Sequence, residues 1–214
     1  GSSYELIFVD DGSRDDFLQE LFNWMNDQFP TRIVQLSRNF GQSNALTAGL
    51  HQVHGDKIIL MDSDLQDRPE DIPLLIEAIN QQQLPMIIAC SRDRGGGLVK
   101  NIFSRIFFFV SGWLSGIKQP PGSGVFRILK RHVWEIVKEQ NRFGGTTLTQ
   151  IYCLEIPYGT IELPREERSS GRSHYRLDKY RKLALNRLFA HSGCRFLRER
   201  TKPCFEVKRI YGSR

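Results

Sequence analysis

"KIILMDSDLQDRPED", residues 57–71, runs from an apolar segment directly into a cluster of acidic side chains. The apolar run at 57–61 predicts a short buried strand, and Pro69 and Asp71 predict the start of a helix that continues to about residue 80. Like charges at this spacing repel, so the acids either bind something cationic or point into water. Four of them fall within nine positions: Asp62, Asp64, Asp67 and Glu70.

The alternation of strand and helix continues on both sides of this stretch. Short apolar runs ended by turn residues predict strands, and apolar residues at helical spacing predict helices between them. The expected strands are 4–9, 32–36, 57–61 and 86–90, and the expected helices are 16–28, 41–53 and 69–80. This order predicts an α/β fold with a mostly parallel sheet and helices on both faces.

Three polar loops follow the first three expected strands: "DDGSRD" (10–15), "SRNFGQ" (37–42) and "DSDLQD" (62–67). Open α/β sheets bind their ligands beyond the carboxyl ends of the strands. We therefore expect these loops to lie on one rim of the sheet and to form a binding site.

The second half of the chain is less regular. We expect a strand at 124–129, a helix at 131–139, one or two strands within 151–164, a polar loop at 166–175 and a helix at 177–190. We assign residues 1–190 to one domain and residues 191–214 to a basic C-terminal extension.

Charge is distributed unevenly along the 214 residues. Residues 1–90 hold 5 Lys and Arg against 14 Asp and Glu, whereas residues 91–214 hold 25 against 10. An acidic half joined to a basic half suits a metal-bound, phosphate-bearing substrate, and it also leaves a nucleic-acid-binding module open.

The four cysteines form no CxxC pair, which favours free thiols in a cytosolic protein over a disulfide framework. Zinc binding by His191, Cys194 and Cys204 is the alternative, although their spacing matches no standard site. We see no signal peptide and no apolar run long enough to span a bilayer. Residues 98–117 are dense in aromatic and aliphatic side chains, and they fit a buried core helix, an interfacial membrane helix or a dimer contact.

Asp62 and Asp64 stand two residues apart at the end of a strand, where alternate side chains project to the same side. Two carboxylates so placed can share Mg²⁺ or Mn²⁺ with substrate phosphates, and Gln66 could add a neutral oxygen. A DxD pair alone is a weak signal, and its place between two other polar loops strengthens it.

Five blocks in fixed order resemble the family 2 glycosyltransferases of the GT-A fold, and within them the polyprenyl-phosphate branch that includes dolichol-phosphate-mannose synthase. The blocks are "YELIFVDDGSRD", "LSRNFGQSNALTAGL", "GDKIILMDSDLQDRPE", "GSGVFRIL" and "EERSSGRSHYRLDKYRKLAL". The resemblance covers about residues 4–190. It implies an inverting transfer from a UDP- or GDP-sugar to a polyprenyl phosphate, at the cytoplasmic face of the membrane.

The resemblance also implies roles for individual residues. Asp11 matches the residue that contacts the nucleobase, and Asp62 and Asp64 match the pair that binds metal and diphosphate and carries the catalysis, with Gln66 as a further metal ligand. The implied nucleotide-sugar site comprises Asp10, Asp11, Gly12, Ser13, Arg38, Asp62, Ser63 and Asp64. The implied acceptor-phosphate site comprises Arg92, Arg94, Arg105, Arg168, Arg172 and Ser173.

Three features depart from the family pattern. Family members usually begin with one more strand, so part of the nucleotide pocket is expected to be missing. Many carry transmembrane helices after the block that matches "KYRKLALNRL", whereas this chain continues with a basic segment. Many have an acidic residue where Val125 stands, which leaves the acceptor open between a polyprenyl phosphate and a sugar or glycan hydroxyl.

Overall fold

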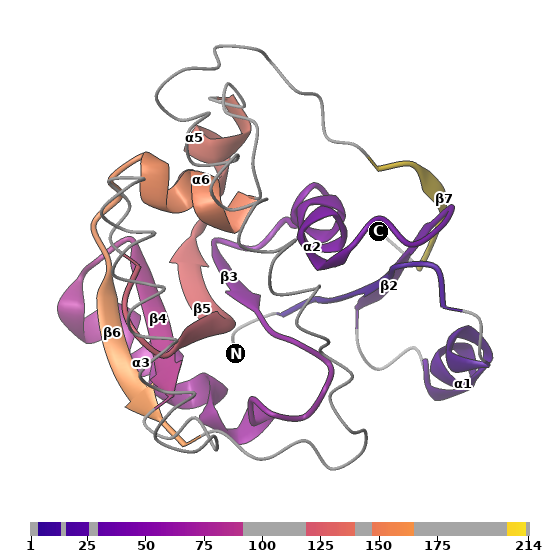
Figure 1. Cartoon of the computed structure of the whole chain (residues 1–214). Helices are drawn as coiled ribbons and strands as arrows, with labels where there is room; N and C mark the ends of the chain where they lie inside the picture. Colours follow the sequence, from indigo (N-terminus) through magenta and orange to yellow (C-terminus); the bar gives the residue numbers. More distant parts are fainter. Residues whose placement is uncertain are drawn as a thin grey trace, which may run out of the picture. The chain divides into compact units, whose positions relative to one another are not determined.

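The computed structural model of the chain describes residues 4–13, 16–25, 30–91, 119–139, 147–164 and 205–212. The chain divides into two compact units, residues 1–56 with 201–214, and residues 57–200. Each unit has its own sheet (Figure 1).

The first unit is built on a three-stranded sheet in the order β1-β2-β7. Its elements are β1 (Leu6–Asp10), α1 (Phe17–Trp24), β2 (Thr31–Leu36), α2 (Gln42–Leu50) and β7 (Val207–Tyr211). β1 and β2 run parallel, and β7 runs antiparallel to β2.

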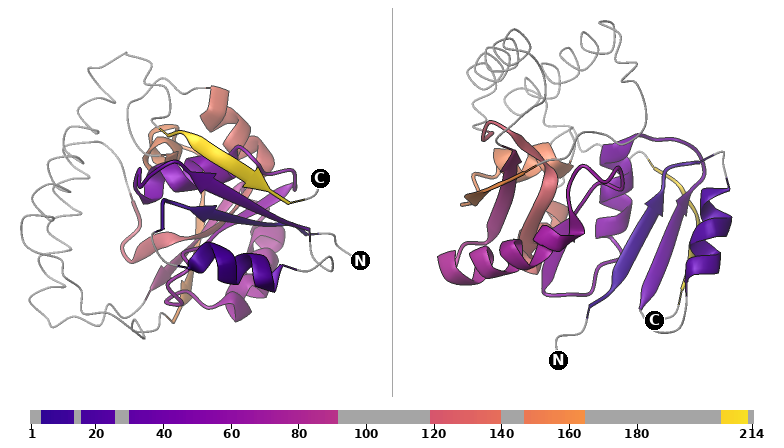
Figure 2. Two further views of the ribbon diagram at one scale, coloured as in Figure 1. Left: turned by 90° about the vertical axis from the view of Figure 1, so that its right-hand side faces the viewer. Right: turned by 90° about the horizontal axis from the view of Figure 1, so that it is seen from below.

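Alternating side chains of β1 place the two helices of this unit on opposite faces of the sheet (Figure 2). Ile7 and Val9 pack against the cluster that contains Ala48 of α2. Phe8 points the other way and meets Trp24 of α1 edge to face, with 6.1 Å between the ring centroids.

Residues 207–211 lie within the segment that we expected to be a basic extension, yet they form a strand of the first sheet. Val207 and the preceding Phe205 pack against the apolar cluster under α2, and Tyr211 meets Phe22 of α1 at 4.7 Å between ring centroids. Apolar residues spaced among the lysines and arginines therefore fix this segment to the sheet.

The second unit contains a four-stranded sheet in the order β3-β5-β4-β6. Its elements are β3 (Lys57–Leu60), the 3₁₀ turn η1 (Pro69–Asp71), α3 (Ile72–Gln82), β4 (Met86–Ser91), β5 (Ser123–Lys130), α5 (Arg131–Glu139), α6 (Thr147–Cys153) and β6 (Gly159–Leu163). β4 and β6 are parallel, while β5 is antiparallel to both β3 and β4.

Helices cover this sheet through apolar residues at helical spacing. Leu75 and Ile79 of α3 are buried against Ile87 and Ile128 of the strands. α5 begins and ends where the sequence predicts, at residues 131 and 139, and Val133 lies on its buried side. The expected α/β class is thus confirmed, although both sheets are mixed because β5 and β7 run antiparallel to their neighbours.

Of the one or two strands expected within 151–164, the structure has one, and the first part of this range is helical. Residues 147–153 form α6, and only residues 159–163 form a strand. Thr147, Gln150 and Ile151 are all buried, which is the three-and-four spacing of one helical face. The alternation that we took for a strand beginning at Ile151 is the end of that helix.

Candidate functional site

Asp10 ends β1 as a buried carboxyl group, with only 2% of its surface exposed. Its Oδ1 accepts a hydrogen bond from the backbone N–H of Ser13 at 2.8 Å, which closes the turn after the strand. Its Oδ2 is buried and has no hydrogen-bond partner among the residues that the structure describes. A buried carboxyl oxygen without a donor is costly and needs an explanation, such as a ligand that donates to it.

Asp11 connects the loop after β1 to the loop after β2. Its Oδ1 accepts the backbone N–H of Phe40 at 2.7 Å, and its Oδ2 accepts that of Gly41 at 2.8 Å. A carboxylate offers about four acceptor positions, so each oxygen retains capacity for a further donor. Sequence reasoning assigned Asp11 to a nucleobase and missed this structural role.

Gly12 makes the close approach of the same two loops possible. Its φ is +75°, and a Cβ at this position would lie 2.6 Å from the backbone carbonyl carbon of Arg38. Only glycine satisfies both conditions. The Arg38 guanidinium in turn lies over the ring of Phe40, 4.6 Å from its centroid. The first two polar loops therefore meet as expected, and they bring Asp10, Asp11, Gly12, Ser13 and Arg38 together.

Asp62 and Asp64 follow β3 in the second unit, and both are partly buried. The backbone N–H of Gln66 donates to Asp64 Oδ1 at 3.2 Å, so this carboxylate stabilises its own turn. Leu65 lies between Asp64 and Gln66 with φ at +59°, and its exposed side chain turns away from the core. The turn holds the two acids on a short, bent segment, with Ser63 exposed between them.

The donor set of this turn fits a divalent ion that keeps substrate or water ligands. Asp62, Asp64 and Gln66 supply hard oxygen atoms, which Mg²⁺ and Mn²⁺ prefer. Within the described ranges, no group of three or more His, Cys, Asp or Glu side chains is arranged to hold a metal. Two carboxylates and an amide could therefore hold an ion only with ligands from elsewhere, as in sites that bind metal and phosphate together.

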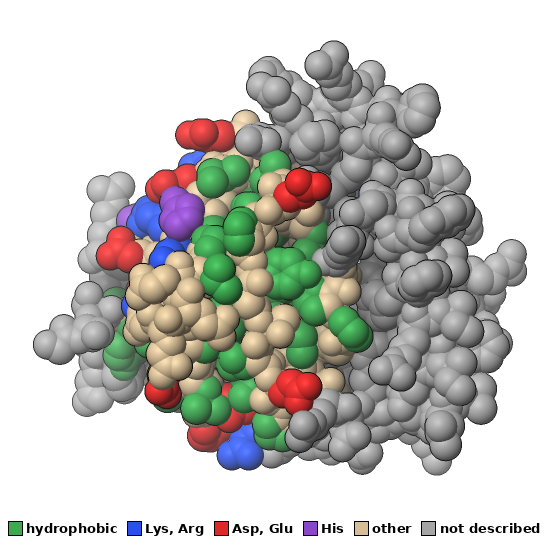
Figure 3. All heavy atoms as spheres, turned by 90° about the vertical axis from the view of Figure 1, so that its left-hand side faces the viewer, with side chains coloured by type: hydrophobic (Ala, Val, Ile, Leu, Met, Phe, Trp, Pro, Cys, Tyr) green, Lys and Arg blue, Asp and Glu red, His purple; other side chains and the backbone are tan. Residues whose placement is uncertain are grey.

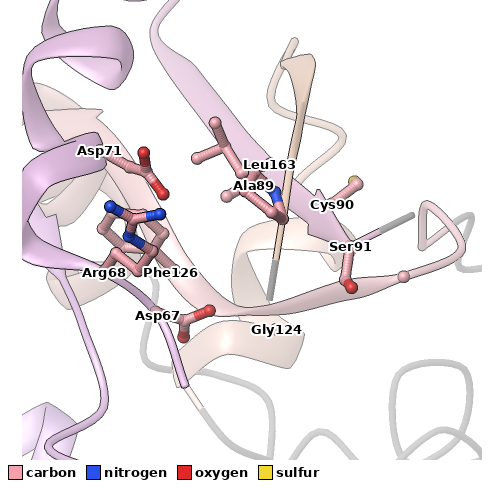
Figure 4. Close-up of a pocket in the computed structure, with 11 residues that line it drawn as sticks. Asp67, Arg68, Asp71, Ala89, Cys90, Ser91, Gly124, Phe126 and Leu163 are labelled. Carbon is pink, nitrogen blue, oxygen red and sulfur yellow. The ribbon is translucent and has the colours of Figure 1, made fainter. Parts of the chain in front are cut away.

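A pocket lies at the carboxyl end of β4, and it includes acids to which the sequence analysis gave no individual role. Asp67, Arg68 and Asp71 lie on one side of it, and Ser91 lies on the other (Figure 4). Asp67 is 8% exposed, and Asp71 has a buried Oδ2 without a hydrogen-bond partner among the described residues. The rest of the lining is Ala89, Cys90, Gly122, Gly124, Phe126, Leu163 and Pro164.

The predicted acceptor-phosphate residues lie outside the described part of the chain. They are Arg92, Arg94, Arg105, Arg168, Arg172 and Ser173. The same holds for the apolar segment 98–117 and for the alternative zinc ligands His191, Cys194 and Cys204. Among the described helices, none is both long and apolar enough to cross a membrane.

The family described as Glycosyl transferase family 2 matches residues 1–137, well over half of the chain.

Curated relatives align with most of the chain. An uncharacterized glycosyltransferase of Synechocystis sp. is 33% identical over 194 residues, which cover 89% of this chain and 60% of the relative. A dodecaprenyl-phosphate galacturonate synthase of Rhizobium johnstonii is 29% identical over 94% of this chain and 60% of its own length. An undecaprenyl-phosphate 4-deoxy-4-formamido-L-arabinose transferase of Yersinia pestis is 31% identical over 82% of this chain and 54% of its own length. The chain spans 54–60% of the length of these relatives.

Solved structures share the fold at low sequence identity. Glucosyl-3-phosphoglycerate synthase of Mycobacterium tuberculosis, in complex with Mn²⁺, UDP-glucose and phosphoglyceric acid, superposes with a TM-score of 0.58 at 18% identity, over 88% of this chain and 68% of that one. A mannosyltransferase of Pyrobaculum calidifontis, in complex with GDP-mannose and Mn²⁺, gives a TM-score of 0.58 at 17% identity. The match covers 88% of this chain and 54% of the mannosyltransferase.

Proposed function

The chain belongs to glycosyl transferase family 2, and we propose on that basis that it moves a sugar from a UDP- or GDP-sugar to a polyprenyl phosphate, with inversion at the anomeric carbon. The expected GT-A fold is confirmed. The observation that carries the proposal is the turn after β3, where Asp62 and Asp64 lie partly buried on one short segment that is stabilised by the Gln66 N–H.

Asp62 and Asp64, with Gln66, would hold Mg²⁺ or Mn²⁺ together with the donor diphosphate. When bound, such an ion supplies positive charge that offsets the negative charge developing on the departing diphosphate. The two carboxylates fix the position of the diphosphate relative to the sheet, and positioning of this kind accounts for much of the acceleration in transfer reactions. Structures of the same fold contain Mn²⁺ with UDP-glucose or GDP-mannose, which supports this assignment.

Asp10, Asp11 and Arg38 would bind the nucleoside part of the donor. The Oδ2 of Asp10, which no described residue contacts by a hydrogen bond, suits a hydroxyl or N–H donor, and Asp11 retains acceptor capacity after bonding to Phe40 and Gly41. Arg38 stacks on Phe40, which holds its guanidinium near the same loops.

The acceptor is proposed from the relatives and from the basic residues of the second half. Two curated relatives are described as acting with dodecaprenyl phosphate or undecaprenyl phosphate. Arg92, Arg94, Arg105, Arg168, Arg172 and Ser173 would bind the acceptor phosphate through guanidinium forks and a hydroxyl group. A phosphate oxygen is already nucleophilic, so the transfer does not require a strong general base.

Contact with the cytoplasmic face of the membrane follows from a lipid acceptor, and we assign it to segment 98–117 and the basic residues that follow. The described face that carries β6 has hydrophobic side chains in its middle, with acidic, basic and histidine side chains around them (Figure 3).

A sugar or glycan hydroxyl is the second candidate acceptor, and Val125 favours it. The Val125 side chain is 7% exposed and apolar, so this position offers no group to a lipid phosphate. A hydroxyl acceptor would need a base, and we assign that role to Asp67, which lines the pocket across from Ser91.

Thermal unfolding with UDP, GDP and their sugar conjugates, each with Mg²⁺, Mn²⁺ or EDTA, tests the donor site. A nucleotide at a hundredfold excess over its dissociation constant stabilises the fold by about 2.7 kcal/mol. We expect one nucleotide to stabilise the chain only with metal, and we expect Asp64→Ala to abolish that gain. Asp56→Ala, an exposed position just before β3, is the matched control. Equal stabilisation of wild type and Asp64→Ala by nucleotide and metal would refute the metal assignment. A separate assay, transfer of sugar to undecaprenyl phosphate, tests the acceptor.

A further inference from the structure

Arg127 carries a fully buried guanidinium in the middle of β5, with 1% of the residue exposed. Arginine is seldom buried to this extent unless a carboxylate pairs with it. Among the described residues, no Asp or Glu forms an ion pair with Arg127. Its Nε donates to the carbonyl of Val125 at 3.1 Å, and its two terminal nitrogens donate to the carbonyl of Gly124 at 2.5 Å and to the hydroxyl of Tyr152 at 3.4 Å.

The carbonyls that Arg127 binds belong to an irregular part of the sheet. Ile88 of β4 pairs with Arg127 of β5, and the next pair is Cys90 with Ser123. Between these two pairs β4 advances by two residues and β5 by four. On the other side of β5, the pairing with β3 ends at Leu60 and Arg127. The guanidinium therefore takes two carbonyls where regular strand pairing stops on both sides, and it stabilises a bulge in β5.

Tyr152 of α6 fixes the guanidinium from the other side. Its ring centroid lies 5.6 Å from the guanidinium carbon, close enough for a cation–π contact, and its hydroxyl accepts the third hydrogen bond. Tyr158 packs edge to face against Tyr152 at 5.9 Å between ring centroids. The position of Arg127 is thus set by α6 and by the chain that leads to β6.

The bulge forms one wall of the pocket at the end of β4. Gly124 lies in the bulge and Gly122 just before it, and both line the pocket that Asp67 and Asp71 also line. Gly122 has a φ of +81°, its carbonyl accepts the backbone N–H of Ser91 at 3.1 Å, and a Cβ there would lie 2.6 Å from the Ser91 carbonyl oxygen. The wall and the end of β4 therefore fit together closely.

We infer that Arg127 is a positioning residue for the transfer reaction: its guanidinium, held by Tyr152, fixes the β5 bulge and through it the wall of Gly122, Gly124 and Ser91. The inference rests on the proposed function, in which the chain continues from Ser91 into the acceptor-phosphate residues Arg92 and Arg94. Arg127 touches no reacting atom in this scheme, and it acts on acceptor binding through the backbone.

Arg127→Lys tests this inference because lysine keeps the charge but loses the planar fork that reaches two carbonyls at once. Hydrogen exchange of residues 119–126 should accelerate about tenfold, while exchange in α3 stays unchanged. Tyr152→Phe keeps the ring, loses the hydroxyl acceptor and should accelerate the same segment to a smaller degree. Arg131→Lys is the matched control, since Arg131 begins α5 and pairs with the exposed Glu135 on its own helix.

Steady-state kinetics then test the link to the reaction. Arg127→Lys should raise KM for undecaprenyl phosphate about tenfold, with KM for the nucleotide sugar and nucleotide-induced stabilisation unchanged. Unchanged exchange in 119–126, in both Arg127→Lys and Tyr152→Phe, would overturn the inference, and so would accelerated exchange with an unchanged acceptor KM. A wild-type chain that transfers no sugar would refute the proposed function instead, and the exchange rates would still decide whether Arg127 fixes the wall.

Discussion

Asp11 holds the backbone of Gly41: the Asp11 Oδ2 lies 2.8 Å from the Gly41 amide nitrogen, immediately before α2. The other oxygen takes the neighbouring N–H of Phe40 at 2.7 Å. One side chain thereby satisfies two amides at the start of a helix and ties together two loops that bear site residues. The position and shape of the proposed nucleotide site both depend on this contact.

We expect Asp11→Asn to destabilise the chain by about 1–3 kcal/mol, because the amide has one acceptor oxygen where the carboxylate has two. The Asn nitrogen would face a backbone N–H that has lost its acceptor. Urea denaturation of wild type and variant measures the difference. Asp16→Asn, at an exposed position of the same unit without a side-chain cap bond, should change stability far less. Equal midpoints for all three proteins would contradict the structural role of Asp11.

The adjacent Asp10 should behave in the opposite way. Its Oδ2 is buried and has no hydrogen-bond partner within the described part of the chain, and an ionised oxygen is more costly to bury than an amide group. An Asn at this position can still accept the Ser13 N–H through its oxygen. The free energy of unfolding of Asp10→Asn should therefore be at most about 1 kcal/mol below that of wild type, or higher than it. Stabilisation by the nucleotide should fall. A large loss of stability with normal nucleotide binding would mean that Asp10 serves the fold and has no role in binding.

Local patterns in the sequence predicted the elements that bear the site. The apolar runs 4–9 and 57–61 and the helical spacing after Gly41 predict β1, β3 and α2 near their observed bounds. They succeed because burial of one face imposes a period that is visible in the sequence. The close approach of Gly12 to Arg38 is also consistent with the turn that "DDGS" predicts.

Features that depend on distant contacts were not predictable in the same way. Arg127 stands between Phe126 and Ile128 in an apolar run, and the one available signal was a charged residue inside that run. Its burial depends on carbonyls freed by a bulge and on Tyr152, which is 25 residues away. The bond from Asp11 to Gly41 spans 30 residues, and β7 joins β2 from the far end of the chain. None of these pairings leaves a periodic pattern.

Glu5 should make stability depend on acid pH. Burial opposes its ionisation, but hydrogen bonds from the backbone N–H groups of His54 and Gly55, with the charge of Arg32, outweigh burial and lower the pKa of Glu5 from its usual value of 4.5. A lowered folded-state pKa stabilises the fold above the unfolded-state pKa, and this contribution is lost as the pH falls through the folded-state value.

We expect Glu5→Gln to lower stability at pH 7 by less than about 1 kcal/mol, because partly exposed ion pairs are screened. The difference from wild type should shrink as the pH falls below 4.5. Urea denaturation at several pH values measures it, and Glu20→Gln at an exposed position of α1 is the control. A difference between wild type and Glu5→Gln that stays constant with pH would refute the assignment.

The pH dependence of the transfer rate should separate the two candidate acceptors. A phosphate monoester takes its second charge at a pKa of about 6, so the rate with a polyprenyl phosphate should rise with pH up to about 6 and then level off. With an acceptor analogue whose phosphate ionises at another pH, the rise in rate should shift to that pH. Asp67→Asn should leave the pH of this rise unchanged. A hydroxyl acceptor instead requires a base, and the rise in rate would then follow a carboxyl group of the chain. If the rise of rate with pH stays at the same pH for every acceptor and disappears in Asp67→Asn, the polyprenyl-phosphate proposal is overturned and Asp67 is the base.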